Sequence, residues 1–290
     1  MDIINIINIE YYNYLSTPSG KHFNLKELTN REYLILLKFL NGENFQGFYN
    51  ALDTLISESI PEFKTLDICD KAYIYIAYYF YSVRSSISLK SEKFDSVEVP
   101  LTILLDSIES DYKKEPVIYK FYNWNSIIHY PTQLIFDDNN SIAIDMLSSL
   151  RKIENLEIKQ EHLEDIRKST PTKVLNDLDY AVIKNFSLNA YICKDVPGAS
   201  AIHENILNPS IFYSIAHIYK DMLENFYNMQ YLLTHYIRVA WESILDMTPI
   251  ETTILYKNFI EDKEKQNEKS KRGNNMNIHD PTVNDTLNPY

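Results

Sequence analysis

Histidine pairs are the first places in this chain of 290 residues where metal binding or acid–base chemistry could arise. His217 and His235 fall on one predicted helix, eighteen residues apart. An α-helix rises about 1.5 Å per residue, so they lie about 27 Å from each other. The pair His203-Glu204 lacks the second histidine of a zinc-protease helix, and His162 lies in a charged run typical of a solvated surface. The histidines therefore predict no metal site.

Carboxylates and thiols give equally weak signals. The run Asp137–Asn140 has the oxygen density of a calcium loop but neither its glycine nor its closing glutamate, which favours a tight turn. Glu62 and Asp67 could form the acid pair of a glycosidase, but acids this common carry no specificity. Cys69 lies between Asp67 and Asp70, whose charges oppose thiolate formation. We therefore expect no catalytic residue and no cofactor.

The composition excludes several further classes of function. Five scattered glycines form neither a phosphate-binding loop nor a dinucleotide-binding turn. The formal net charge of −12 argues against a nucleic-acid groove, which needs clustered Lys and Arg. The most apolar window, Ala72–Val83, is too short and too rich in tyrosine to span a membrane, and the N-terminus lacks the pattern of a signal peptide. Cys69 and Cys193 have no partner pattern, which favours reduced thiols in a cytoplasmic setting.

The 23 tyrosines are the unusual feature of the composition. Each ring buries apolar area while its hydroxyl needs a partner or water, which suits an interface. Semi-buried positions in the core are the simpler interpretation.

The hydrophobic periodicity predicts a mainly helical α+β fold. Capping signals, glycines and prolines divide the chain into segments. These are an N-terminal β-hairpin (1–28), a helical unit of three helices (29–90), a small antiparallel sheet (91–140), a helical middle region (141–200), a C-terminal helical hairpin (205–272) and a disordered tail (273–290). Thr29-Asn30-Arg31-Glu32 is a capping box that starts one helix, and a third helix is expected to begin at Asp67 or Asp70.

Within these segments the pattern makes more specific predictions. Apolar residues alternate over Val97–Leu105 and Val117–Phe121, which indicates strands, and Ile127–Phe136 is rich in β-forming residues. The turn at Asp137–Asn140 is expected to lead into a helix over Ile142–Ile153. The charged stretch 154–168 is a solvated helix or linker, Thr172–Phe186 is helical, and Val196-Pro197-Gly198 is a loop.

The C-terminal hairpin is the most informative part of the chain. Apolar residues at a spacing of three or four, among them Leu233 and Tyr236 on the apolar face, predict one long helix from Asn208-Pro209 to Ala240 and beyond, with a sharp break at Asp246-Met247. The next helix begins on a full capping signal. Thr248 can cap, Pro249 takes the first helical position, and the Glu251 carboxylate can reach back to the N–H of the cap.

Three blocks of sequence together resemble the baseplate hub family of T-even-type contractile-tailed phages. Residues 25–89 are similar to the opening pattern of that family, with two short helices and a third that starts on Asp. Residues 97–136 match a small sheet whose last strand ends in a Tyr-Pro pair, here Tyr130-Pro131. The third block carries Met247-Thr248-Pro249 and Glu251, which match a Met-[ST]-Pro-x-Glu helix start.

Two departures from that family limit the resemblance. Some members carry a zinc-ribbon-like hairpin after the first block, but Ser91–Ser96 contains no cysteine, so no zinc is implied. The middle of the chain, Glu154–Ser200, is longer than the family pattern, and its role stays unassigned.

The resemblance implies a non-enzymatic protein of tail morphogenesis, found in the virion baseplate and in the host cytoplasm during assembly. Its partners would be other baseplate hub and tail proteins, including the tape-measure protein, with no nucleic acid and no membrane span. Both a structural subunit of the hub and an assembly chaperone absent from the mature virion fit. A third alternative, from another class, is a metal-dependent hydrolase or nuclease using Asp137 and Asp138.

The partner contacts expected from this resemblance lie in the C-terminal hairpin. The residues are Tyr227, Tyr231, His235, Trp241, Met247 and Glu251. The alternative to a partner contact is that Met247 and Glu251, together with Thr248 and Pro249, only form a helix corner.

Overall fold

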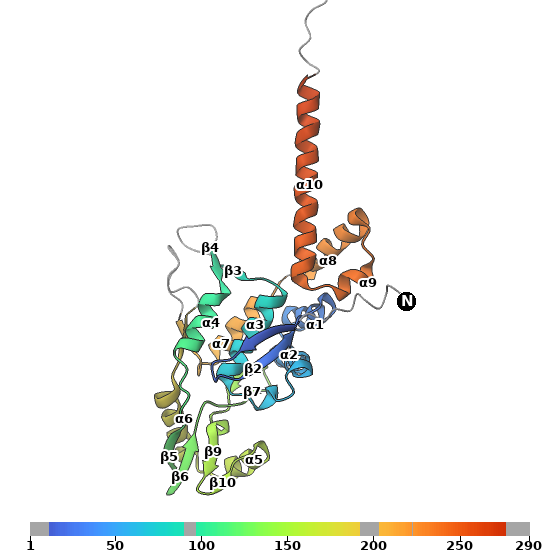
Figure 1. The fold of residues 1–290 in the computed structure, drawn as a ribbon. Coiled ribbons are helices and arrows are strands. Elements are labelled where there is room, and N and C mark those ends of the chain that lie inside the picture. The colour runs from blue at the N-terminus through green and yellow to red at the C-terminus, as the bar shows by residue number, and fades with distance from the viewer. Residues whose placement is uncertain (1–11, 90–96, 192–202, 222, 277–290) are drawn as a thin grey trace, which may run out of the picture.

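The computed structural model describes residues 12–89, 97–191, 203–221 and 223–276 (Figure 1). It confirms the mainly helical α+β class: helices surround several small antiparallel sheets, and a long C-terminal helix projects from the body. The predicted loop at residues 196–198, the segment 91–96 and the tail from residue 277 onward lie outside the described residues.

The described part of the chain begins, as predicted, with a β-hairpin. Strands β1 (Tyr12–Ser16) and β2 (His22–Lys26) pair antiparallel. The turn closes where the Gly20 N–H donates to the Thr17 carbonyl at 2.8 Å. Gly20 adopts a φ of +83°, a conformation that glycine accepts without steric cost.

Three helices follow the hairpin and form the centre of the body: α1 (Asn30–Asn41), α2 (Phe45–Ser59) and α3 (Ile68–Ser82). The predicted capping box is present at α1, where Thr29 caps and Glu32 bonds back to it. Asp67 caps α3. Nearly every residue of α3 is buried, which is why its sequence reads as a continuous apolar and tyrosine-rich run.

The strand predicted over Val97–Leu105 is wrong beyond Pro100. Strand β4 (Val97–Pro100) pairs with β3 (Ser86–Leu89), and helix α4 (Leu101–Ser110) starts directly after the proline. The apolar residues after Pro100 fit the period of a helix as well as that of a strand. Leu101, Leu104, Leu105 and Ile108 are buried at helical spacing, and proline favours the start of a helix.

A four-stranded antiparallel sheet in the order β10-β9-β6-β5 lies at the opposite end of the body from the projecting helix (Figure 1). Its strands are β5 (Val117–Phe121), β6 (Trp124–Ile128), β9 (Leu150–Ile153) and β10 (Leu156–Glu157). A separate hairpin joins β7 (Leu134–Phe136) to β8 (Ile142–Ile144) through the predicted turn.

The helix predicted over Ile142–Ile153 is therefore wrong. That stretch forms β8, a short 3₁₀ turn η3 (Met146–Ser149) and β9. The side chain of Asp145 caps the 3₁₀ turn, which halts the strand after Ile144. Pairing of β8 with β7 and of β9 with β6 outweighs any local helical preference.

The middle region ends in helices packed beside this sheet. Helix α6 (Thr172–Phe186) coincides with the predicted helix, and the charged stretch before it contains helix α5 (Gln160–Ser169). A short pair of strands, β11 (Asn189–Tyr191) and β12 (His203–Asn205), leads to helix α7 (Ser210–Tyr219).

The single long helix predicted from Asn208 to Ala240 is also wrong. The first break follows Tyr219, and the second follows Ile237, at the left-handed Arg238. The elements are α7, α8 (Leu223–Leu232), which continues into a π-helical turn η4 (Leu233–Ile237), then α9 (Trp241–Asp246) and α10 (Pro249–Met276). Side chains of α1 cause the first break: Tyr33 donates to the Tyr219 carbonyl at 3.0 Å, and Asn41 donates to the Asp221 carbonyl at 3.1 Å. These carbonyls no longer need helical partners.

The last helix extends further than predicted. Disorder was expected from Gly273, but α10 continues to Met276. The break at Asp246-Met247 and the helix start at Thr248-Pro249 are as predicted.

Tyrosines are part of the core rather than only its edge. Tyr49, Tyr75, Tyr130 and Tyr219 are among the largest fully buried side chains. Buried hydroxyls find backbone partners, as where Tyr49 donates to the Phe212 carbonyl and Tyr219 to the Tyr75 carbonyl. Much of the tyrosine richness therefore serves the fold.

The capping box at the start of α10 gives a first testable prediction. The Glu251 N–H donates to Thr248 Oγ1 at 3.2 Å, and the Thr248 N–H donates to the Glu251 carboxylate at 2.9 Å. Thr248→Ala should lower the free energy of unfolding by about 1 kcal/mol. Chemical denaturation measures this, with the exposed helical Thr54→Ala as a control that should stay within about 0.5 kcal/mol of wild type. Equal effects of the two variants would contradict a capping role.

Candidate protein-docking surface

Residues 223–276, from α8 to α10, form a C-terminal unit that is fixed to α1 through Asn30. The Asn30 side chain is fully buried. Its backbone N–H donates to the Met247 carbonyl at 2.7 Å. Its Nδ2 donates to the Ile244 carbonyl at 2.7 Å and to Thr252 Oγ1 at 2.5 Å. One side chain thus joins α1 to the end of α9 and to the first turn of α10.

Surface contacts supplement this joint. Arg31 forms ion pairs with Glu242 at 2.9 Å and with Asp246 at 3.2 Å, and all three side chains are more than half exposed. Such pairs contribute little to stability. The buried contacts therefore carry the attachment: Asn30, the apolar residues Ile244 and Leu245, and Phe226 of α8, whose ring packs against Tyr33.

Four of the six residues expected to contact partners lie exposed on this unit. Tyr227 and Tyr231 on α8 are 40% and 54% exposed, and Trp241, the first residue of α9, is 39% exposed. His235 stacks on Tyr231 with ring centroids 4.5 Å apart. Tyr227 and Tyr231 are four residues apart, so they share one face of the helix.

The other two expected residues have roles within the fold. The carbonyl of Met247 accepts the hydrogen bond from Asn30, and Glu251 completes the capping box of α10. These are the contacts of a helix corner. A partner contact by either residue stays a prediction.

Two aromatic residues of this surface were not among those expected. Tyr236 is 60% exposed, and its ring lies 5.9 Å from that of Phe259 on α10. The sequence placed Tyr236 on the apolar face of a long helix. The π-helical turn and the left-handed Arg238, with a φ of 62°, turn it outward instead. We call Tyr227, Tyr231, His235, Tyr236 and Phe259 the aromatic surface.

A second exposed apolar cluster lies on the β5–β6 hairpin. Ile118 is 77% exposed and Trp124 55%, and the Tyr122 ring lies 6.4 Å from that of Trp124. The strand alternation over 117–121 places Ile118 opposite the residues facing the core, which was the signal available in the sequence.

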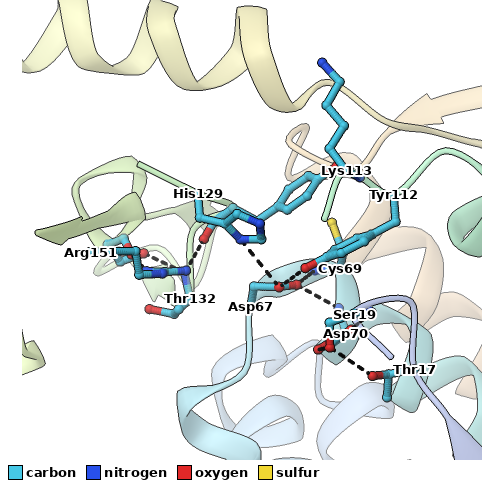
Figure 2. A network of polar contacts seen from close by, with 12 residues as sticks. Thr17, Ser19, Asp67, Cys69, Asp70, Tyr112, Lys113, His129, Thr132 and Arg151 are labelled. Carbon is cyan, nitrogen blue, oxygen red and sulfur yellow. Dashed lines mark hydrogen bonds and ion pairs between the residues drawn. The ribbon is translucent and has the colours of Figure 1, made fainter. Parts of the chain in front are cut away.

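A buried polar network lies where the first hairpin meets α3 and the segments around the sheet (Figure 2). Asp67 Oδ1 accepts the N–H groups of Cys69 and Asp70, each at 3.0 Å, and its Oδ2 accepts the Tyr112 hydroxyl at 2.8 Å. His129 Nδ1 lies 4.0 Å from the same carboxylate. A cavity of about 260 Å³ adjoins these side chains.

The electrostatics of this network follow from burial. Burial raises the pKa of Asp67, and burial together with the Asp67 charge raises the pKa of Asp70 to about 6. Burial lowers the pKa of His129 and raises that of the Cys69 thiol, which therefore stays protonated at neutral pH. Buried groups whose pKa values are shifted in this way are frequent in active sites.

The hydrogen bonds of Asp67 and Asp70 nevertheless show that both carboxylates stabilise the fold. Asp67 caps α3, and Asp70 accepts the N–H of Ser19 at 3.1 Å and its hydroxyl at 2.6 Å, which holds the first hairpin against α3. Arg151 donates to the carbonyls of Ser148 and Tyr130, which places its charge at the edge of the network. The buried charges are therefore explained by a structural role, because they join the first hairpin to α3.

The raised pKa of Asp70 gives a prediction about pH. Its folded pKa of about 6 exceeds the ordinary 3.8, so the folded chain retains a proton that the unfolded chain loses. The resulting stability is present at low pH and lost as pH rises through 6. Between about pH 4.5 and 6.5, the free energy of unfolding should fall by about 1–2 kcal/mol more in wild type than in Asp70→Asn.

Urea denaturation at a series of pH values measures this difference. The amide of Asp70→Asn still accepts the Ser19 N–H, so the variant isolates the charge. Asp106→Asn, an exposed change on α4, should follow the wild-type curve. If the stability of Asp70→Asn changed with pH in the same way as that of the wild type, the titration would belong to another group.

The aspartates proposed for metal chemistry form a turn. Asp137 Oδ1 accepts the N–H groups of Asn139 at 2.9 Å and Ser141 at 2.7 Å, which orders the connection between β7 and β8. In the part of the chain that the structure describes, no group of three or more His, Cys, Asp or Glu side chains is placed to hold a metal ion. No helix among the described residues is long and apolar enough to cross a membrane.

A family model described as "T4 bacteriophage base plate protein" matches residues 10–192, well over half of the chain. The match includes the first hairpin, helices α1–α6 and the four-stranded sheet. It ends before α7, so the aromatic surface lies beyond it and the β5–β6 cluster within it. Neither a comparison with curated proteins nor one with solved structures found a match.

Proposed function

This chain belongs to the T4 bacteriophage base plate protein family, and from that premise we propose that it is a non-enzymatic subunit of the central hub of a phage baseplate. The family match supports a structural role in the tail baseplate and interaction with other tail proteins. The hub position, retention in the mature particle and contact with the tape-measure protein are our proposal.

The observation that carries the docking role is the aromatic surface. Tyr231 and Tyr236 are each more than half exposed on a unit that Asn30 fixes to the body. Exposed aromatic side chains in fixed positions lose little conformational entropy on binding and provide large contact areas, which is why Tyr and Trp recur at protein interfaces. A neighbouring tail protein that covered these rings would remove their apolar surface from water.

An assembly chaperone is the second candidate. The formal net charge of −12 supports it, because strong acidity keeps a protein with exposed apolar surfaces soluble before its partners arrive. Both candidates use the same surface for docking. They differ in whether the protein stays in the particle.

Quantitative mass spectrometry of purified particles beside infected-cell lysate separates the two. A virion protein of known copy number serves as the internal reference. We expect a fixed, small number of copies per tail. Abundance in the lysate with absence from particles would overturn the proposal of a retained hub subunit and assign the chain to assembly.

A further inference from the structure

A groove of about 1000 Å³ lies between the C-terminal unit and the body. Residues of β3, of the end of α3 and of α7 line it on the body side, and residues of α8 and α10 line it on the other. Figure 1 shows where these elements lie. Lys220, directly after α7, is also a lining residue. The groove is separate from the aromatic surface, none of whose five members is a lining residue.

The groove runs along an edge of β3. Ser86, Ile87 and Ser88 all line it, although consecutive side chains of a strand point to opposite faces. Three consecutive residues can line one groove when it follows the strand edge. β3 pairs with β4 in a two-stranded sheet, so within the described residues its other edge has no strand partner. Such an edge can accept an added strand.

One wall of the groove is apolar. Tyr79 and Val83 at the end of α3, together with Phe226 on α8, are at least nine-tenths buried. Met229 and Leu232 continue this wall along α8 and are partly exposed. Apolar side chains of a bound segment would be sheltered from water here.

The charges of the groove are opposite in sign to those of the whole chain. Its lining includes three exposed cations, Arg84, Lys220 and Lys257, and one carboxylate, Asp221, on a chain of formal net charge −12. Asp221 accepts a hydrogen bond from Asn225 at 3.1 Å. No ion pair of the three cations is found in the described part of the chain. A local positive site on an acidic protein selects a negatively charged partner.

We propose that this groove binds an extended acidic segment of a partner protein, added as a strand to the edge of β3. In an extended segment alternate side chains point to opposite sides, so a segment of alternating carboxylates and apolar residues can offer both kinds of side chain to a groove lined by cations and by an apolar wall. The inference does not depend on the hub assignment. It concerns a second surface, and its test requires no phage particle.

Fluorescence anisotropy with a labelled octapeptide of alternating glutamate and valine tests the proposal on the full chain. We expect saturable binding that weakens as salt rises, and no binding of the matching lysine–valine peptide. The variant Lys220→Glu with Lys257→Glu should weaken binding at least about tenfold. Lys120→Glu with Lys173→Glu changes net charge equally at exposed positions outside the groove lining and should leave binding within about twofold.

Two N-methylated peptides test the added strand. One carries methyl groups on the odd amides and the other on the even amides, so that only one of them loses the donors that face β3. We expect one peptide to bind and the other to fail. Equal binding of both, or equal loss of binding in the two charge-reversal variants, would overturn the proposal.

The occupant is tested by removing residues 2–11, which combine Asp2 and Glu10 with five isoleucines. We expect the truncated chain to bind the glutamate–valine peptide as tightly as the full chain does. Binding that tightens at least tenfold on truncation would assign the groove to the chain's own N-terminal segment and overturn the assignment to a partner.

Discussion

Replacing Tyr231 and Tyr236 by serine should remove this protein from assembled baseplates. Both rings are exposed, at 54% and 60%, so the changes leave the core intact. A central aromatic side chain in an interface typically contributes 2 kcal/mol or more, about a 30-fold change in affinity for each residue. We expect copies per particle to fall at least about tenfold, measured by mass spectrometry of phage that carry the variant gene.

The control for this experiment is Tyr180→Ser. Tyr180 on α6 is 69% exposed and lies outside the aromatic surface, so the change matches in chemistry and exposure. Normal incorporation of the double variant, with an unchanged unfolding transition, would show that the aromatic surface is not a docking site.

A parallel variant at the β5–β6 hairpin distinguishes the two exposed clusters. Trp124→Ser removes the largest exposed ring within the family-matched region, whereas the aromatic surface lies beyond that region. Loss of incorporation in Trp124→Ser alone would move the docking site to the sheet. Loss in both would indicate two partners, one at each end of the body (Figure 1).

Local signals in the sequence predicted the helix starts well. Thr29, Asp67 and Thr248 each cap a helix as expected, because a helix cap depends on residues only two or three positions away. The first hairpin and helix α6 were predicted for the same reason: their turn and periodicity lie within a short window.

The failures share a different cause, because contacts from distant residues decided them. The break after Tyr219 depends on Tyr33 and Asn41 of α1, which are far away in the sequence and therefore invisible to a local pattern. The strands at 142–153 depend on pairing with β6 and β7. Tertiary contacts of this kind outweigh local preference and leave no local signal.

The candidate site follows the same division. Tyr227, Tyr231 and Trp241 could be chosen as exposed aromatics of a predicted helical hairpin. Tyr236 could not, because its exposure follows from the π-helical turn before Arg238. The polar network around Asp67 was also beyond reach, since His129 and Tyr112 come to that carboxylate from separate elements.

Asn30→Ala should be the most destabilising polar substitution at the joint of the C-terminal unit, lowering the free energy of unfolding by about 3 kcal/mol. The change removes the two hydrogen bonds of Nδ2, while the Ile244 carbonyl keeps the N–H of Met247 as a donor. Two net hydrogen bonds contribute about 2 kcal/mol, and the cavity left by the buried amide adds to the loss. The Oδ1 atom has no partner among the described residues, so its removal offsets part of the loss.

Urea denaturation measures the loss, and Asn50→Ala, at an exposed asparagine on α2, should stay within about 0.5 kcal/mol of wild type. Thr252→Val removes the acceptor of one Nδ2 bond, so the double variant with Asn30→Ala should destabilise by less than the sum of the single changes. Additive effects would mean that the two side chains act independently. Asn30 fixes the unit that carries the aromatic surface. Asn30→Ala should therefore also reduce incorporation into particles, although every ring of that surface remains. This result is expected because docking depends on rings held in fixed positions.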